Sequence, residues 1–230
     1  MAIILYGNRL SPFVEKVYRG LMLKQIPFQQ HEPHGPFDLR RNNPTTGKMP
    51  ALDLNGQRLF DSTLILRALD EFKPEPPLLS ADPQTAAQQR LLEDWADESL
   101  YWYGMVLRWN IPANAARTIS LLCKELPPIL RPPLKILAPR FVAGQTRAQG
   151  LGRLPLPILL RELDGHLATL VRLLSDGPFF FGVSQPSIAD LAVFGQLGFL
   201  HSAVTPEGIA AVEQHAELLE FCQRLDAMTD

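Results

Sequence analysis

The stretch LYGNRLSPFVEKV, residues 5–17, joins an expected strand to an expected helix. The run AIILYG, residues 2–7, is short, apolar and rich in Ile and Leu, which is typical of a buried strand. Apolar residues then recur at helical spacing over residues 13–22. Ser11 before Pro12 is an ordinary helix start, because a serine oxygen accepts a free amide and proline has none. These residues alone favour a structural role for Ser11 over a chemical one.

The segments that follow extend this start to a β-α-β-loop-β-β-α order within about 75 residues. IPFQQHE (26–32) predicts a second strand, and HGPFDLRRNNPTTGK (34–48) predicts a polar, turn-rich loop. MPALDLNGQRLFD (49–61) predicts two strands around Asn-Gly, the strongest short hairpin signal. STLILRALDEF (62–72) predicts a helix. The order is that of a small α/β domain.

A proline-rich stretch, KPEPPLLSADP, separates this domain from a region of different character. We expect an N-terminal domain at residues 1–75, a linker at 76–85 and an all-helical domain at 86–230. The first helical pattern, residues 84–110, predicts one long helix. LPPILRPPLKILAPRF (126–141) predicts a kinked helix packed on the domain, with prolines at its starts.

Composition excludes several classes of protein. With 230 residues, 46% apolar, the chain can form a full core, and a net charge of -2 predicts no nucleic-acid partner. Its two cysteines have no metal-ligand spacing, so we expect reduced packing residues and no metal site. No segment resembles a leader or a membrane span, which predicts a soluble cytoplasmic protein.

The charge is unevenly distributed. Residues 108–153 contain eight Arg or Lys and one acid, Glu125. A solvated face is the favoured interpretation, and attraction of anions is the alternative. Leu130, Leu134, Leu137 and Phe141 also fit one helix face, so contact of a basic amphipathic helix with a membrane surface is a less favoured hypothesis.

Four stretches together resemble the glutathione transferase superfamily. LYGNRLSPFVEKV, NPTTGKMPALDL and FDSTLILRALDE occur in the family's order and spacing, and FFFGVSQPSIADLAVFGQL is similar to the start of its buried helix. In this last stretch Ser187 and Asp190 have the spacing of a capping box. The Ser-Pro-Phe motif is similar to the serine-type classes, including tau and zeta. The helical half is also faintly similar to the metaxin and failed-axon-connections branch. The resemblance implies a thioredoxin-like domain followed by an all-α domain.

The resemblance implies that the N-terminal domain binds glutathione as co-substrate. The Met49-Pro50 bond would be cis, and the Met49 backbone would pair with the cysteinyl backbone of glutathione as a strand does. The alternative is a simple strand entry.

The family's pattern places the γ-glutamyl carboxylate at the helix opened by Asp61 and Ser62. A plain helix cap is compatible with this role. Lys48 is expected to meet the glycyl carboxylate, with Arg40 and Arg41 as rivals.

Within this resemblance Ser11 is the expected catalytic hydroxyl, donating to the glutathione sulfur. A free thiol has a pKa of about 8.5, and lowering it by about two requires only about 2.7 kcal/mol. Tyr6, near the end of the first strand, is the rival, and Phe13 is expected beside the site. Because Ser11-Pro12-Phe13-Val14 stands where thioredoxin has C-x-x-C, the chain has no dithiol for disulfide exchange.

The acceptor pocket is expected along the first long helix. Trp95, Trp102 and Trp109 are seven residues apart, which predicts one face, with Leu91 and Met105 on the same stripe. Two interpretations of this stripe are equally favoured. One is an aromatic wall for a small hydrophobic electrophile, formed by Trp102, Met105 and Trp109, and the other is an ordinary core stripe.

The resulting prediction is a glutathione transferase-like enzyme. Alternatives are a glutathione-dependent peroxidase or isomerase, and a non-catalytic binding or scaffold protein with this fold. The family also implies a homodimer, with residues 34–37 and 63–72 as plausible contact regions.

Overall fold

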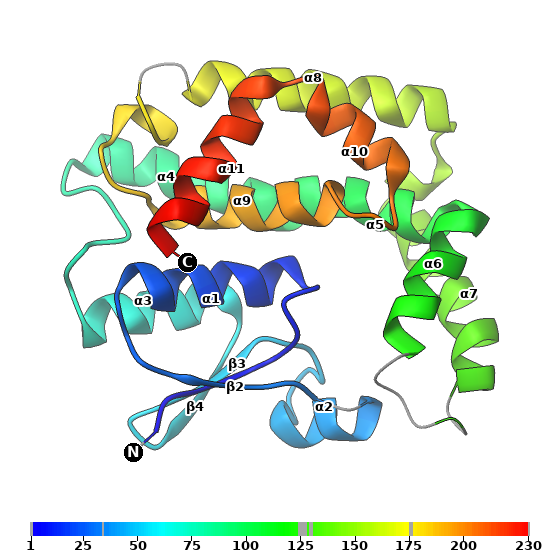
Figure 1. Cartoon of the computed structure of the whole chain (residues 1–230), viewed down its shortest axis with the longest axis horizontal. Coiled ribbons are helices and arrows are strands. Elements are labelled where there is room, and N and C mark those ends of the chain that lie inside the picture. The colour runs from blue at the N-terminus through cyan, green and yellow to red at the C-terminus, as the bar shows by residue number, and fades with distance from the viewer. Residues whose placement is uncertain (1, 34, 124–127, 129–130, 175–176, 230) are drawn as a thin grey trace.

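The computed structural model describes residues 2–229 except 34, 124–127, 129–130 and 175–176. Its first part contains β1 (Ile4–Tyr6), α1 (Pro12–Leu23), β2 (Gln29–His31), α2 (Pro36–Asn42), β3 (Ala51–Leu54), β4 (Gln57–Phe60) and α3 (Ser62–Phe72). The four-stranded sheet has the order β2-β1-β3-β4, with β1 parallel to β2 and antiparallel to β3, and β3 antiparallel to β4. In Figure 1, α1 and α3 lie between this sheet and the helical half. The predicted strands, the hairpin and both long helices of this part are confirmed.

Alternation along the strands assigns each side chain to a face of the sheet. Leu5 and its partner Leu52 are fully buried in the core with residues of α1 and α3. Tyr6 therefore points to the other face, where it lies in one pocket with residues of α2. At the turn, Asn55 and Gly56 have φ of 51° and 81°, the left-handed pair that a two-residue hairpin requires.

The prediction of a loop over residues 34–48 was wrong for residues 36–42, which form helix α2; residue 34 lies outside the described residues. Local signals explain the helix: Gly35 precedes it at φ 103°, and a proline opens it. Asp38 lies in its first turn, and Arg40 and Arg41 lie in its last, so each charge opposes the helix dipole.

The regular elements described in the second part are all helices or helical turns. This part contains α4 (Pro83–Trp95), a π-helical turn (Ala96–Leu100), α5 (Tyr101–Asn110), α6 (Pro112–Leu122), α7 (Arg131–Gln149), α8 (Leu156–Leu174), α9 (Ile188–Leu200), α10 (Pro206–Glu213) and α11 (Ala216–Thr229). Short 3₁₀ turns occupy Leu151–Arg153 and Phe180–Gly182.

Helix α9 forms the centre of the helical half and packs directly on α1 (Figure 1). Nearly all of its residues are buried, and the predicted capping box of Ser187 and Asp190 is present with both bonds. A Cβ on Gly195 would lie 2.6 Å from the Pro12 carbonyl oxygen, so only glycine permits this close approach of α9 to the start of α1.

The prediction of one regular helix over residues 84–110 was wrong, because the π turn at Ala96–Leu100 interrupts it. A π turn holds an extra residue, which rotates everything after it by about 100° relative to a regular helix. The seven-residue spacing of Trp95 and Trp102 therefore does not keep them on one face, and Leu91 is 72% exposed. The predicted stripe is broken at this turn.

The prediction of a proline-kinked helix packed on the domain was only partly right for α7. Pro139 lies inside it, and Thr146 is its one buried residue among those described. Leu137 and Phe141, from the predicted apolar face, are 62% and 67% exposed, whereas Leu134 is half-buried. Leu130 lies outside the described residues. Among the described helices, none is long and apolar enough to cross a membrane.

Candidate functional site

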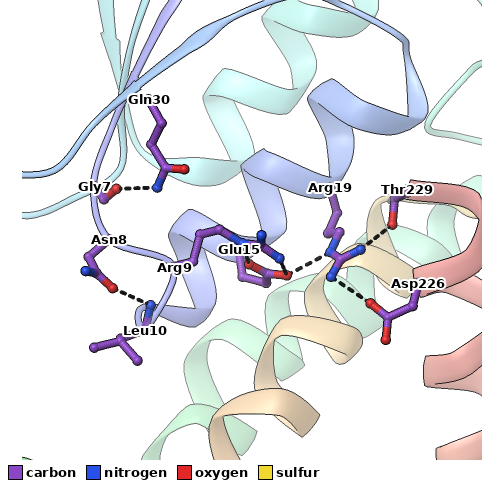
Figure 2. Close-up of polar contacts among 9 residues, drawn as sticks. All are labelled: Gly7, Asn8, Arg9, Leu10, Glu15, Arg19, Gln30, Asp226 and Thr229. Atoms are coloured by element: carbon purple, nitrogen blue, oxygen red, sulfur yellow. Dashed lines mark hydrogen bonds and ion pairs between the residues drawn. The ribbon is translucent and has the colours of Figure 1, made fainter. Parts of the chain in front are cut away.

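The loop from Gly7 to Ser11 is held in one shape by a set of short polar contacts (Figure 2). Gln30 Nε2 donates to the Gly7 carbonyl at 2.9 Å, and the Leu10 N–H donates to Asn8 Oδ1 at 2.8 Å. The Ser11 N–H then donates to the Asn8 carbonyl at 3.0 Å. Asn8 and Gln30 were missed by the sequence analysis, although an Asn whose side chain binds two residues on is a recognised turn signal.

Ser11 is the N-cap residue of α1, yet its side chain makes no capping hydrogen bond. Its backbone carbonyl accepts the first helical bond, from the Glu15 N–H, and its side chain is half-buried. The structure therefore does not support the capping role for the hydroxyl, which stays available beside the positive end of the helix.

The start of α1 is also fixed to the end of the chain. Arg9 binds Glu15 with two bonds of 2.6 and 2.8 Å, and Arg19 donates to the same carboxylate at 2.7 Å (Figure 2). Arg19 further binds Thr229 Oγ1 at 2.7 Å and Asp226 at 2.6 Å on α11. Although burial raises the pKa of Glu15, the hydrogen bonds from both arginines outweigh it and hold that pKa below its usual value.

The loop that ends at Met49 lies against this segment. A Cβ on Gly7, whose φ is 141°, would lie 3.2 Å from the Met49 Cβ, so the two loops are in close contact. The Met49-Pro50 bond is cis, as predicted. Pairing of β1 with β3 stops at Ala51, which leaves the Met49 amide and carbonyl outside the ladder.

Asn43 organises the turn before Met49, and the sequence analysis missed it. Buried at 2% exposure, it donates to Thr46 Oγ1 and to the Lys48 carbonyl, both at 2.8 Å, and accepts from the Thr46 N–H. The Lys48 side chain is exposed on this turn. The signal in the sequence is Asn followed by Pro-Thr-Thr-Gly, a run of turn residues.

The start of α3 supplies donors for an anion. Asp61, with φ 73°, caps the helix by accepting from the Thr63 and Leu64 N–H groups at 3.0 and 3.1 Å. The N–H and hydroxyl of the buried Ser62 are the first-turn donors that Asp61 does not take. Asp61 therefore acts as a helix cap, and Ser62 is the donor left for a ligand.

Tyr6 is engaged elsewhere. Its hydroxyl donates to Asp53 at 2.9 Å and accepts from Arg58 at 2.7 Å, on the sheet face opposite α1. Burial, together with the hydrogen bond and charge of Asp53, raises the pKa of Tyr6.

A buried ionic cluster lies beneath the start of α3. The fully buried Lys16 contacts Glu93, Asp97 at 2.6 Å and Thr63 at 3.2 Å, and Thr63 also donates to Glu93. Burial raises the pKa of Asp97, against the charge of Lys16. Gln196 of α9 reaches the same carboxylate, 3.5 Å away. The cluster connects α1 and α3 to the π turn, and the sequence analysis did not predict it.

The predicted acceptor residues do not come together. Phe13 packs edge-on against Tyr101 at 4.9 Å, and burial raises the pKa of Tyr101 to about 12. Trp102 and Met105 are half-buried on α5. Trp109 instead lines a cavity of about 1010 Å³ between α5, α6 and α7, to which neither Trp102 nor Met105 contributes.

Comparison with protein families places two models on this chain. "Glutathione S-transferase, N-terminal domain" matches residues 5–77, and "Glutathione S-transferase, C-terminal domain" matches residues 164–225.

The chain spans about half the length of the curated relatives that it matches. Glutathione S-transferase U1 of Arabidopsis thaliana is 30% identical over 120 residues, covering 51% of this chain and 53% of the relative. Protein LigF of Sphingobium sp. is 30% identical over 116 residues, covering 47% and 43%.

Solved structures align over nearly the whole chain at lower identity. Beta-etherase LigF from Sphingobium sp. has a TM-score of 0.72 at 22% identity, covering 99% of this chain and 96% of that one. A tau-class glutathione S-transferase of mango, Mangifera indica, has a TM-score of 0.65 at 20% identity, covering 100% and 93%. At these identities the likeness concerns the fold.

Proposed function

Since this chain belongs to the glutathione transferase superfamily, we propose that it binds glutathione and activates its thiol for attack on a small apolar electrophile. The observation that carries the proposal is the Ser11 hydroxyl, which is left without a capping bond at the start of α1. Residues 1–75 would form the glutathione-binding domain, residues 76–85 a linker, and residues 86–230 the acceptor domain of a cytoplasmic homodimer.

Ser11 stabilises the thiolate in this proposal. A hydroxyl that donates to a thiolate forms a charge-assisted bond, and the end of α1 adds a favourable potential. Together these two effects are of the size needed to lower a thiol pKa by about two, about 2.7 kcal/mol. The contacts of Gly7, Asn8 and Leu10 fix the loop that carries Ser11. The hydroxyl is therefore already in position before the reaction and need not reorient during it.

The other glutathione contacts follow from the same geometry. The Met49 backbone, which lies outside the sheet's ladder, would pair with the cysteinyl backbone, with Pro50 fixing the turn. Ser62 would receive the γ-glutamyl carboxylate at the start of α3, and Asp61 would keep that helix end in shape. Lys48, exposed on the turn built by Asn43, is the proposed partner of the glycyl carboxylate.

Tyr6 is the weaker candidate for thiol activation. Its hydroxyl is already bound by Asp53 and Arg58, and its raised pKa makes it a poorer donor to an anion. The acceptor pocket is proposed along α5, beside Phe13 and Tyr101, with Trp102 and Met105 as candidates, whereas Trp109 lines the cavity between α5, α6 and α7. A substrate panel should include an ether, because a relative and a structural neighbour are LigF, the latter named as a beta-etherase.

The proposal is tested by an ultraviolet titration of bound glutathione thiolate against pH, with wild type, Ser11→Ala and Tyr6→Phe. We expect the wild-type thiol to titrate about two pH units below free glutathione, Ser11→Ala to abolish this shift, and Tyr6→Phe to retain it. Binding of glutathione with an unshifted thiol, or no binding, would refute the catalytic proposal and favour a scaffold role. Turnover of a hydroperoxide in place of conjugation would assign the peroxidase alternative.

A further inference from the structure

We propose that α7 binds the protein to an anionic membrane surface, with the helix lying along the lipid headgroups and its outer face turned to the lipid. The proposal rests on the exposed side chains and the charges of α7, so it does not depend on the proposed thiol chemistry. The two family models match residues 5–77 and 164–225, and α7 lies outside both matched ranges.

The outer face of α7 carries an apolar strip. At about 100° per residue, five residues of this helix fall within an arc of about 80°, with no polar residue among them: Leu134, Leu137, Phe141, Gly144 and Ala148. Leu137 and Phe141, near the middle of the strip, are both more than half exposed. A helix of a globular domain normally buries its apolar face, so this strip is a surface that lacks its expected cover within the described chain.

Basic residues border this apolar strip. Arg140 and Arg147 are exposed along one edge of it, and Lys135 is exposed on the other side of the helix. Arg140 and Arg147 have no ion-pair partner within the part of the chain that the structure describes. The described parts of α5, α6 and α7 contain no Asp or Glu that would oppose these charges. Apolar side chains beside unopposed positive charge are the combination that holds a helix in the interface of an anionic membrane.

Helix α7 lies at the edge of the molecule, beside α6 and away from the sheet (Figure 1). Thr146, its one buried residue among those described, donates to Asn110 Oδ1 at 2.8 Å, and Arg153 donates to the Arg147 carbonyl at 2.7 Å. Thr146 lies about 160° around the helix from the middle of the apolar strip. The side that is anchored to α5 and the side that carries the strip are therefore opposite, so the helix can meet a flat surface without leaving the domain.

A membrane fits this face better than a second copy of the chain does. Contact of the strip with the same strip of a second copy would bring Arg140 and Arg147 of each copy against those of the other, which like charges oppose. A lipid surface instead offers phosphate and carboxylate groups along the whole helix, whose 19 residues extend over about 28 Å. Side chains of an interfacial helix enter the boundary of the acyl chains by about 5–10 Å, a depth that Leu137 and Phe141 can reach while the arginines stay at the headgroups.

The charge requirement is tested by flotation of the full chain with vesicles. Vesicles of phosphatidylcholine and phosphatidylserine are compared with vesicles of phosphatidylcholine alone. Each basic residue near an anionic surface contributes about fivefold to binding, so we expect wild type to prefer the phosphatidylserine vesicles by about 25-fold or more. Arg140→Gln/Arg147→Gln should weaken binding to these vesicles by about 25-fold, and binding to phosphatidylcholine by no more than about twofold.

The matched control for this pair is Arg90→Gln/Arg161→Gln. It removes the same charge from exposed positions on α4 and α8, and should bind both kinds of vesicle as wild type does. Equal losses in the two pairs would show that net charge alone governs binding, and would overturn the inference.

The apolar requirement is tested on the strip itself. Leu137→Ser should weaken binding to phosphatidylserine vesicles by about fivefold or more, because the leucine can no longer enter the lipid. Leu91→Ser on α4, where the leucine is 72% exposed, should bind as wild type does. Circular dichroism and unfolding midpoints establish that both variants are folded. Wild-type binding in Leu137→Ser/Phe141→Ser would overturn the inference.

Sedimentation velocity without vesicles distinguishes lipid from a protein partner of the same chain. We expect Leu137→Ser to leave the oligomeric state unchanged. A change of oligomeric state in this variant, or wild-type protein that does not bind phosphatidylserine vesicles, would assign the strip to a protein interface and overturn the inference.

Discussion

Replacing Lys16 by methionine should destabilise the protein strongly, because it removes the one cation found in the cluster formed by the described residues. Lys16 is fully buried, and Glu93 and Asp97 are only 3% and 7% exposed. Both carboxylates contact its ammonium group. Lys16→Met would therefore leave two buried carboxylates facing each other.

The expected loss in the free energy of unfolding is about 3–5 kcal/mol, the usual result of removing one partner of a buried ion pair. For a chain of this length that loss corresponds to a fall in Tm of about 6–20 °C. The loss should also depend on pH. Burial already raises the pKa of Asp97 against the charge of Lys16, and removing that charge raises it further. When an acid has a higher pKa in the folded state than in the unfolded state, the folded protein becomes less stable as pH rises. The loss in the free energy of unfolding of the variant should therefore be larger at about pH 8 than at about pH 5.

Urea unfolding followed by tryptophan fluorescence at both pH values measures this loss. The control replaces the ammonium group and the three side chains around it by apolar ones, Lys16→Met/Thr63→Val/Glu93→Leu/Asp97→Leu, and should regain most of the stability because no buried charge is left unpaired. A loss below about 1 kcal/mol at pH 8, or the same loss at both pH values, would refute the reasoning.

Two further predictions concern α1 and its contacts. Gly195→Ala should destabilise the protein by about 1–3 kcal/mol, because the added Cβ would lie 2.6 Å from the Pro12 carbonyl oxygen. Gly198→Ala, whose added Cβ would meet no atom within 4 Å, should stabilise the protein by up to about 1 kcal/mol. Equal effects of the two substitutions in urea unfolding would contradict this. The lowered pKa of Glu15 means that its carboxylate stabilises the fold above its ordinary pKa of 4.5, and that this contribution is lost as pH falls through the lower folded value. Glu15→Gln should therefore flatten the fall in stability between about pH 5 and pH 3, and a curve parallel to wild type would argue against the arginine contacts.

Much of the fold could be predicted because its signals are local. The Ser-Pro start of α1, the Asn-Gly hairpin and the capping box of Ser187 and Asp190 each depend on residues within a few positions of one another. Helix α2 was missed although its signals are also local, because it is short and lies among turn residues.

The π turn could not be predicted from hydrophobic periodicity, because an inserted residue changes the face without changing the composition. Asp97 in this turn binds Lys16, 81 residues earlier in the chain. The turn therefore depends on a long-range contact, which the spacing of residues within the helix cannot predict. The assignment of Trp95 and Trp102 to one stripe failed for this reason, whereas Trp102 and Trp109 both follow the turn on α5, and only Trp109 of these two lines the cavity.

Local signals in the sequence predict the order of the elements and the residue types at the candidate site, since turn chemistry and periodicity act over short distances. How those residues are used depends on the tertiary structure. In the folded chain the Ser11 hydroxyl makes no capping hydrogen bond, and Tyr6 is hydrogen-bonded to Asp53 and Arg58. Basic residues of α7 line one cavity. Each of these outcomes depends on contacts between side chains that are distant in the sequence. The packing of α1, α7 and α9 on their neighbours determines those contacts.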